Sequence, residues 1–351
     1  MADQIRVLIV DDSAFMRKII GDLLSSDSGI AVIGTARDGI DAVEKCKLLR
    51  PDVVTLDVEM PRLDGLACLE RLMNECPTPV VMVSSLTQEG AATTVRALAL
   101  GAVDFIAKPS GSISLDMAKV RDELTAKVKV AARANLRRAR LGQPLPVVVG
   151  GRTVGREGGR DIGRPRRIVC IGCSTGGPGA LHEVVPRLPA DLGAPVLIVQ
   201  HMPPGFTRSL AQRLDELSRL QVREAAAGDH FGPGDVLIAP GGSHMTVAGG
   251  DTIALSQDPP LHGVRPAVDV TLHSIVQHYG GDAVGVILTG MGFDGARAMA
   301  ELHRAGGRTI VEHQSTCVVY GMPRAVVELG VADVVAPIHE IAERIVEAVQ
   351  R

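Results

Sequence analysis

Short apolar strands alternate with amphipathic segments along most of this chain, and that alternation restricts the fold more than any other feature. Runs of β-branched residues that suit buried parallel strands occupy residues 5–10, 52–57, 79–85 and 102–108. The predicted helices between them lie near residues 14–25, 38–49, 64–75 and 88–100. This order predicts a doubly wound α/β sheet, whose functional side chains gather at the carboxyl ends of its strands.

The same alternation returns in the second half of the chain. Apolar strands are predicted at residues 166–172, 194–201, 234–240, 282–290 and 308–313. Helices are predicted near residues 178–188, 205–219, 267–279 and 294–305. Because 351 residues are too many for one typical core, we expect two doubly wound α/β domains.

The segment between the two halves has a different composition. A helical pattern runs from Leu115 to about Leu141, and Arg, Gly and Pro then dominate. From Arg133 to Arg167 there are ten Arg, no Lys and two acidic residues, a local charge of +8. Basic runs can bind nucleic acid, but this one has no interleaved aromatic residue, and we interpret it as a linker. The predicted boundaries are 1–125 for the first domain, 126–165 for the linker and 166–351 for the second domain.

Composition excludes several other classes of protein. Aromatic residues make up 2% of the chain and Trp is absent, which argues against a stacking platform for nucleic acid. The N-terminus does not resemble a signal peptide, and no apolar run is long enough to cross a bilayer. The six Cys have no metal-ligand spacing. We therefore expect a cytoplasmic protein with free thiols that is not inserted in a membrane.

Acidic residues stand at strand ends in the first half. Asp11 and Asp12 follow the strand at 5–10, Asp57 ends the strand at 52–57, and Lys108 stands at the end of the strand at 102–108, directly before Pro109. Three converging carboxylates need a cation, and such hard oxygen ligands suit Mg²⁺, so Asp57 could attack a phosphoryl donor. Ser84 is placed to donate a hydrogen bond to that phosphoryl group. The alternative is that Asp11 and Asp12 only cap the next helix.

The motifs VLIVDDS, DVVTLDVEMPRLDG, VVMVSS and GAVDFIAKP together resemble the receiver domain of two-component response regulators, a flavodoxin-like fold. The resemblance covers about residues 3–125. It implies that Asp57 accepts phosphate from a histidine kinase. It also implies that Ser84 shifts toward the phosphate and that Phe105 then changes rotamer.

In the second half, Gly172-Cys-Ser174-Thr-Gly176 fits G-x-S-x-G between a strand and a helix. That pattern is typical of a nucleophilic serine, although a phosphate-binding loop and a helix cap stay open as alternatives. His201 and Asp294 follow two other strands, so a base and its orienting carboxylate could converge on Ser174. Asp269 is the main competitor to Asp294 for the third position.

The motifs VCIGCSTGGPGAL, VQHMPPGFT, APGGSHM, HGVRPAVD and ILTGMGFDGA resemble the catalytic domain of chemotaxis protein-glutamate methylesterases, over about residues 166–350. The resemblance implies a Rossmann-like domain in which Ser174, His201 and Asp294 are catalytic and the backbone amides near Thr175 and Met291 hold the oxyanion.

The same resemblance implies the substrates, the partners and the regulation. The substrates would be glutamate methyl esters, and also glutamines, on the helical cytoplasmic domains of methyl-accepting chemotaxis receptors. A chemotaxis histidine kinase would supply the phosphate. The unphosphorylated receiver is expected to obstruct the esterase cleft. No cofactor is expected for the esterase and no direct binding of nucleic acid. The alternative is a response regulator with a non-hydrolytic output domain that binds nucleotides or nucleic acid.

Overall fold

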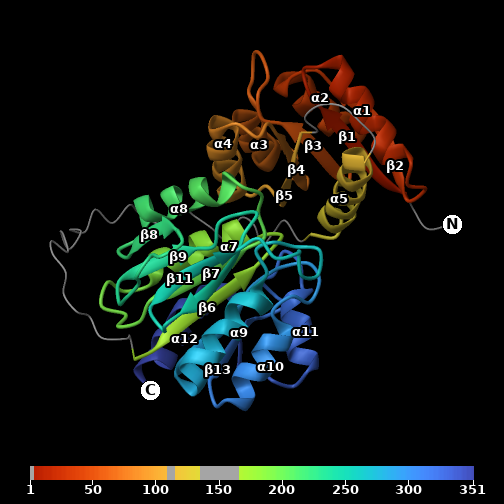
Figure 1. Cartoon of the computed structure of the whole chain (residues 1–351). Helices are drawn as coiled ribbons and strands as arrows, with labels where there is room; N and C mark the ends of the chain where they lie inside the picture. Colours follow the sequence, from red (N-terminus) through yellow and green to blue (C-terminus); the bar gives the residue numbers. More distant parts are fainter. Residues whose placement is uncertain (1–3, 109–114, 135–165) are drawn as a thin grey trace. The chain divides into compact units, whose positions relative to one another are not determined.

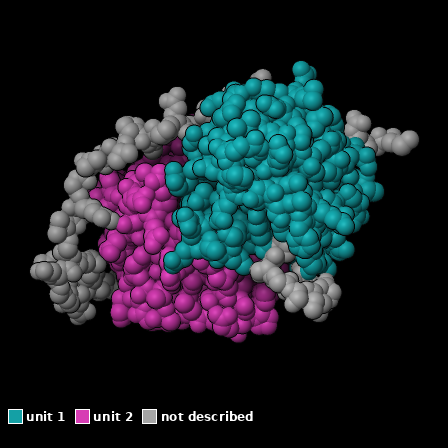
Figure 2. Space-filling model, turned by 90° about the horizontal axis from the view of Figure 1, so that it is seen from above, with its two compact units in different colours: residues 1–141 teal, residues 142–351 magenta. Residues whose placement is uncertain are grey.

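The computed structural model describes residues 4–108, 115–134 and 166–351 (Figure 1). The chain divides into two compact units, residues 1–141 and 142–351, which Figure 2 colours separately. The Arg- and Gly-rich part of the predicted linker falls outside the described residues, and the predicted domain boundaries stay predictions.

Unit 1 is a five-stranded parallel sheet with strand order β2-β1-β3-β4-β5. Its strands are β1 (Ile5–Val10), β2 (Ile30–Ala36), β3 (Val53–Asp57), β4 (Val80–Ser84) and β5 (Asp104–Ala107). Its helices are α1 (Ala14–Ser25), α2 (Gly39–Leu49), α3 (Gly65–Glu75), α4 (Gln88–Ala99) and α5 (Leu115–Ala131). Helix α1 packs with α5 on one face, and α2, α3 and α4 pack in turn on the other. The strand order reverses at β1 and β3, where the crevice of such a sheet binds ligands.

Unit 2 is a seven-stranded parallel sheet with strand order β14-β13-β12-β6-β7-β9-β8. Its strands are β6 (Ile168–Cys173), β7 (Val196–Gln200), β8 (Gln221–Glu224), β9 (Asp235–Ile238), β12 (Ala283–Ile287), β13 (Arg308–Glu312) and β14 (Val334–Ala336). Its helices are α7 (Gly177–Val184), α8 (Phe206–Leu217), α9 (Val268–Tyr279), α10 (Ala296–Arg304), α11 (Met322–Glu328) and α12 (Ile338–Gln350). A two-stranded antiparallel ribbon, β10 (His244–Ala248) and β11 (Thr252–Ser256), packs against α9. The strand order reverses around β6, which lies between β12 and β7.

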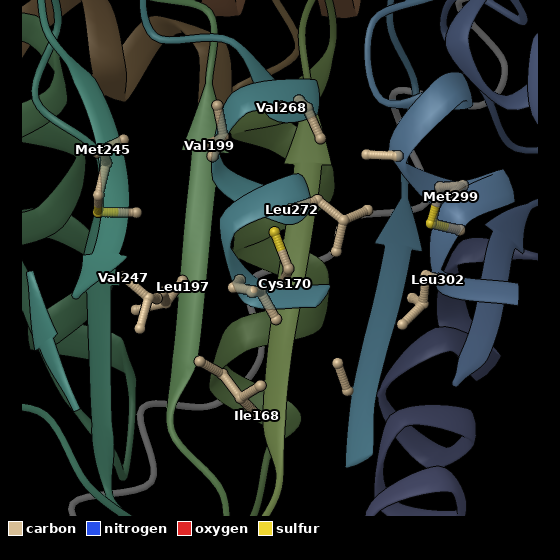
Figure 3. Close-up of a cluster of buried hydrophobic side chains, with 14 of the residues drawn as sticks. Ile168, Cys170, Leu197, Val199, Met245, Val247, Val268, Leu272, Met299 and Leu302 are labelled. Carbon is tan, nitrogen blue, oxygen red and sulfur yellow. The ribbon is translucent and has the colours of Figure 1, made fainter. Parts of the chain in front are cut away.

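The core of unit 2 lies between the sheet and helices α9 and α10 (Figure 3). Cys170 of β6, Leu197 of β7 and Leu272 of α9 are among its fully buried side chains. Burial raises the pKa of the Cys170 thiol to about 12, so this cysteine is a neutral packing residue. The packing fixes α9 against β6 and β7, and it thereby fixes the backbone at the start of α9 near the strand ends.

The predicted fold class is confirmed: both units are doubly wound parallel α/β sheets. The predicted helix from Leu115 is not continuous, since α5 ends at Ala131 and residues 132–134 are not helical; the rest of the predicted span, to about Leu141, lies outside the described residues. The ribbon β10–β11 and the last helices and strand of unit 2 were not predicted. The ribbon strands are short and half-polar, so their apolar pattern is weak.

Candidate functional site

Unit 1 brings its predicted acidic residues together at the carboxyl ends of β1 and β3. One oxygen from each of Asp11, Asp12 and Asp57 lies within 4.8 Å of the others. The Lys108 ammonium lies 2.8 Å from Asp57 Oδ2 and 3.2 Å from Asp11 Oδ2. The cap alternative is wrong for this turn, because the N-cap of α1 is Ser13, whose hydroxyl accepts a hydrogen bond from the Met16 amide.

The donor set fits a divalent cation. Asp11 Oδ2 and Asp57 Oδ2 are buried oxygens that accept no hydrogen bond of normal geometry, and their close partner is the Lys108 ammonium. Three carboxylates against one ammonium leave an excess of two negative charges. An all-oxygen set of this kind suits Mg²⁺.

Burial of Asp57 changes its acidity. Desolvation raises the pKa of Asp57 to about 6, and the nearby Lys108 ammonium only partly opposes this. For Lys108, burial works against the charged form, but the Asp57 and Asp11 carboxylates hold its pKa above the ordinary value. The ammonium therefore stays charged beside Asp57.

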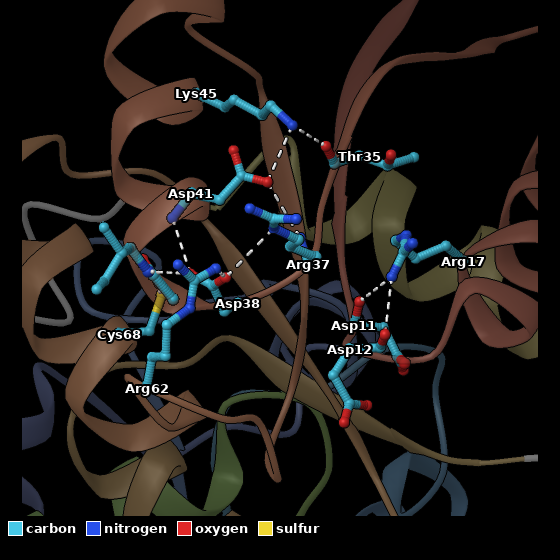
Figure 4. A network of polar contacts seen from close by, with 12 residues as sticks. Asp11, Asp12, Arg17, Thr35, Arg37, Asp38, Asp41, Lys45, Arg62 and Cys68 are labelled. Atoms are coloured by element: carbon cyan, nitrogen blue, oxygen red, sulfur yellow. Dashed lines mark hydrogen bonds and ion pairs between the residues drawn. The ribbon is translucent and has the colours of Figure 1, made fainter.

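A network of buried and exposed polar groups holds the loops around this acidic site (Figure 4). Arg17 of α1 donates hydrogen bonds to the backbone oxygens of Asp11 and Asp12, at 2.7 and 3.0 Å. Asp38, the fully buried N-cap of α2, pairs with Arg62 from the loop that follows β3. These contacts fix the loop that carries Asp11 and Asp12 and the loop that follows Asp57.

Ser84 and Phe105, the predicted support residues, lie on β4 and β5, the two strands that follow β3 in the sheet. The Ser84 hydroxyl donates 3.2 Å hydrogen bonds to the backbone oxygens of Ser85 and Gly90, at the start of α4. Phe105 is buried, and the Lys127 ammonium lies 5.1 Å from the centre of its ring. Their parts in a phosphate response stay predictions.

In unit 2, Ser174 lies in the turn between β6 and α7. The residue that caps α7 is Gly176, at a φ of 80°, so the interpretation of Ser174 as the helix cap is wrong. The left-handed backbone at Gly176 favours glycine. The Ser174 amide donates to the Thr289 carbonyl at 3.0 Å. A Cβ built at the next residue, Gly290, would lie 2.9 Å from the Ser174 Cβ, so the loop after β12 passes directly beside the serine.

His201 and Asp294 form a hydrogen-bonded pair at the same edge of the sheet. His201 Nε2 lies 2.8 Å from Asp294 Oδ2, and the His201 amide donates to the carbonyl of Cys173 at 3.2 Å, one residue before the serine. Asp294 also accepts hydrogen bonds from the amides of Val268 and Asp269, at 2.7 and 3.0 Å. Although burial opposes ionisation, the His201 and amide hydrogen bonds hold the pKa of Asp294 below its ordinary value.

Asp269 is not the partner of His201. Its carboxylate accepts a hydrogen bond from the Ala298 amide at 2.9 Å and lies 3.0 Å from Nε2 of another histidine, His262. Its backbone amide donates to Asp294, and the two carboxylates lie close together, with one oxygen of each within 4.8 Å of the other. Of the two candidate carboxylates, the one that contacts the imidazole of His201 is Asp294.

Two buried polar residues near Ser174 were not singled out from the sequence. Gln200 Nε2 donates to the backbone oxygens of Ser174 and His201, at 3.0 and 3.2 Å. Glu312 Oε2 accepts the Thr289 amide at 2.7 Å. Both end apolar strands, in VLIVQ and RTIVE, and a polar residue at the end of a buried strand is the signal that could have found them.

The acidity of Glu312 gives a test of this site's electrostatics. Burial raises the pKa of Glu312 to about 7, against the hydrogen bonds from Thr289, Thr316 and Cys317. The unfolded chain releases this proton near pH 4.5, so the stability that the protonated carboxyl contributes is complete below pH 4.5 and is lost as pH rises through 7. The loss amounts to about 3 kcal/mol.

Glu312→Gln is therefore expected to melt higher than the wild type at pH 8, by an amount that shrinks toward pH 4.5, because glutamine stays neutral. The measurement is the pH dependence of the Tm of unit 2 in both proteins, followed by calorimetry. Parallel Tm curves between pH 4.5 and 8 would contradict the assigned acidity.

Taken together, the two sites describe a class of protein: a unit with a cluster of carboxylates and a lysine at its strand ends, joined to a unit whose serine turn lies at the same sheet edge as a His–Asp pair. The model of the CheB methylesterase family matches residues 169–345, and that of the response regulator receiver domain matches residues 7–118. The chain belongs to the CheB methylesterase family and carries its receiver domain.

Whole-length relatives agree with this assignment. A protein-glutamate methylesterase/protein-glutamine glutaminase of Symbiobacterium thermophilum is 63% identical, over 98% of this chain and 97% of its own. A protein of the same name from Pyrococcus horikoshii is 47% identical, over 100% of this chain and 95% of its own. The crystal structure of the Thermotoga maritima CheB methylesterase catalytic domain is 46% identical and covers 52% of this chain and 97% of its own, with a TM-score of 0.50.

Among the described helices, none is both long enough and apolar enough to span a bilayer. The alternative of a non-hydrolytic output domain is not favoured, because the catalytic-domain family covers nearly all of unit 2.

Proposed function

We propose that this protein is a phosphorylation-regulated serine hydrolase that cleaves glutamate methyl esters on chemotaxis receptors and deamidates glutamines there. The observation that carries the proposal is the His201–Asp294 pair: the His201 imidazole bonds to Asp294, and the His201 backbone is held beside Ser174 by its amide bond to Cys173 and by the side chain of Gln200. A hydroxyl, an imidazole and an orienting carboxylate at one sheet edge are the parts of an acyl-transfer site.

The proposed reaction proceeds in two halves. A proton on Nε2 of His201 satisfies Asp294 and leaves Nδ1 as the base. Nδ1 takes the proton of the Ser174 hydroxyl while the serine oxygen bonds to the ester carbonyl carbon. The bond from that carbon to the methoxy group then breaks, and Nδ1 gives the proton to the methoxide, which leaves as methanol. A water then attacks the acyl-serine with His201 as base, which releases the receptor's glutamate and restores the serine. With glutamine as substrate, ammonia leaves in place of methanol.

Backbone amides near Thr175 and Met291 are proposed to hold the oxyanion. Thr175 begins the turn into α7, and Met291 follows Gly290, whose backbone passes beside Ser174. Each such donor contributes about 3 kcal/mol to the transition state in comparable sites.

The proposed partners follow from the same assignment. The substrates are the cytoplasmic helical domains of methyl-accepting receptors, and the phosphodonor is a chemotaxis histidine kinase. Asp57 is the proposed phosphate acceptor. Asp11, Asp12 and Asp57 would hold Mg²⁺, which when bound neutralises phosphoryl oxygens, while Lys108 adds a fixed positive charge beside them.

The test of the activity uses receptors that carry both methyl esters and glutamines. Purified protein is expected to release methanol in the amount of ester lost, and mass spectrometry of the receptor peptides should find glutamate at both kinds of position. Intact methyl esters after prolonged incubation would reject the proposal.

Regulation through Asp57 gives a separate prediction. A small phosphodonor with Mg²⁺ is expected to raise the rate of methanol release by about 5- to 150-fold, the range of couplings of 1–3 kcal/mol. Asp57→Asn is expected to keep the basal rate and lose the stimulation, because no carboxylate remains to accept phosphate. The control is Asp22→Asn, which removes an exposed carboxylate of α1. Equal stimulation of the Asp57 variant would show that the phosphate acts elsewhere.

A further inference from the structure

Glu312 is a buried carboxylic acid that the proposed chemistry does not use. It ends β13, and its side chain is 1% exposed. Within the described part of the chain no ion pair reaches it, and the titratable groups that face it are the thiols of Cys173 and Cys317. An unpaired acid at such a position is costly, and it persists only where its hydrogen bonds serve a purpose.

The hydrogen bonds of Glu312 lead to Ser174 through a single residue, Thr289. Glu312 Oε2 accepts the Thr289 amide at 2.7 Å. The Thr289 carbonyl accepts the Ser174 amide at 3.0 Å. The Thr289 hydroxyl donates to the carbonyl of Thr175, also at 3.0 Å, and accepts the amide of Val319 at 2.9 Å. Thr289 is thus held at its amide by Glu312, and it in turn holds Ser174 and Thr175 of the serine turn, residues 174–176 between β6 and α7.

The serine turn is fixed from its other side by Gln200. Gln200 Nε2 donates to the Ser174 carbonyl, and its Oε1 lies 3.1 Å from the Cys173 sulfur, which donates to it. The turn therefore lies between two buried polar side chains at the ends of strands β7 and β13. Gln200 contacts it directly, and Glu312 contacts it through Thr289.

We propose that Glu312 is a positioning residue for hydrolysis: by holding the Thr289 amide, it sets the position of Ser174 relative to His201. The inference rests on the proposed role of Ser174 as nucleophile. Without an acceptor at position 312, the buried Thr289 amide is unsatisfied, and the loop that carries it must move to find another partner. That loop also contacts the Ser174 amide, so the serine moves with it. Displacing a nucleophile by about 1 Å costs about 100-fold in rate.

The test compares Glu312→Leu, Glu312→Asp and Glu312→Gln with the wild type. The leucine variant has no acceptor, the aspartate variant holds its carboxylate one methylene too far away, and the glutamine variant keeps a carbonyl oxygen in place. The control is Thr309→Val, which removes a buried hydroxyl from the same strand, β13. That hydroxyl bonds to Val331 and Asp333 and not to the serine turn. The readouts are kcat and KM for methanol release, and the rate at which a fluorophosphonate labels Ser174.

Glu312→Leu is expected to lower kcat and the labelling rate by about 10- to 100-fold, with KM within about threefold of the wild-type value. Glu312→Asp is expected to lower the same two rates by about tenfold. Glutamine and the control should stay within about threefold of the wild type. Calorimetry first establishes that each variant is folded at the assay temperature. A folded Glu312→Leu variant with wild-type kcat and labelling rate would overturn the inference. If Glu312→Leu does not fold, wild-type rates in Glu312→Asp would overturn the inference instead.

Ser174→Ala separates this inference from the proposed function. If the alanine variant still releases methanol, the proposed function fails. If it is inactive while the leucine and aspartate variants react at the wild-type rate, only the role of Glu312 fails.

Discussion

Ser174→Ala is expected to lower kcat for methanol release by about 10⁶-fold, the largest effect of any single substitution in this chain. Alanine removes the oxygen that bonds to the ester carbon and leaves the backbone of the turn unchanged. The Ser174 amide and carbonyl, which bond to Thr289 and Gln200, are kept. The variant should therefore fold normally and bind receptor with unchanged affinity.

The measurement is methanol release from methylated receptor by wild type, Ser174→Ala and Ser209→Ala. The last removes a hydroxyl from α8, far along the chain from the serine turn, and should keep wild-type activity. If Ser174→Ala hydrolyses the ester at more than about one thousandth of the wild-type rate, the serine is not the nucleophile.

Asp294→Asn is expected to lower kcat by about 10⁴-fold with little change in KM. Both oxygens of Asp294 accept hydrogen bonds: Oδ2 from the Val268 amide and His201, and Oδ1 from the Asp269 amide. An asparagine must place its NH₂ group against one of these donors. If the NH₂ group faces His201, the imidazole can accept its hydrogen bond only through an unprotonated Nε2. The ring proton then moves to Nδ1, and Nδ1 can no longer act as the base.

The size of this effect is read from kcat with saturating receptor and from the rate of Ser174 labelling, which should fall in parallel. Asp282→Asn, at an exposed position before β12, is the matched control. Labelling of Asp294→Asn at the wild-type rate would remove Asp294 from the proposed set and return Asp269 to consideration.

The sequence predicted the acidic site of unit 1 and the three candidate residues of unit 2 for the same physical reason. Parallel strands end at one edge of a sheet, so Asp11 and Asp57, or Ser174 and His201, can be placed at the same edge without knowledge of the loops. The alternation of strands and helices also sufficed for the fold class, because apolar runs such as 196–200 and 283–287 are buried throughout.

The remaining features depend on loop geometry and on contacts that a local pattern does not contain. Asp294 was preferred and Asp269 was its main competitor, and only the course of the loops decides that Asp294 contacts His201 and Asp269 contacts His262. The extent of α5 was overestimated because its helical pattern continues beyond Ala131. Glu312 and Thr289 are 23 residues apart, and nothing in either segment signals their hydrogen bond.

The most direct test of the central claim, that Ser174 is an activated nucleophile, is the stoichiometry of covalent labelling against activity. Wild-type protein is treated with increasing amounts of a fluorophosphonate, and the label is located by peptide mass spectrometry while methanol release is measured on the same samples. We expect one label per chain, on Ser174, with activity falling in proportion and reaching zero at full occupancy. Full activity in fully labelled protein, or inactivation by a label on another residue, would contradict the role of Ser174 as nucleophile.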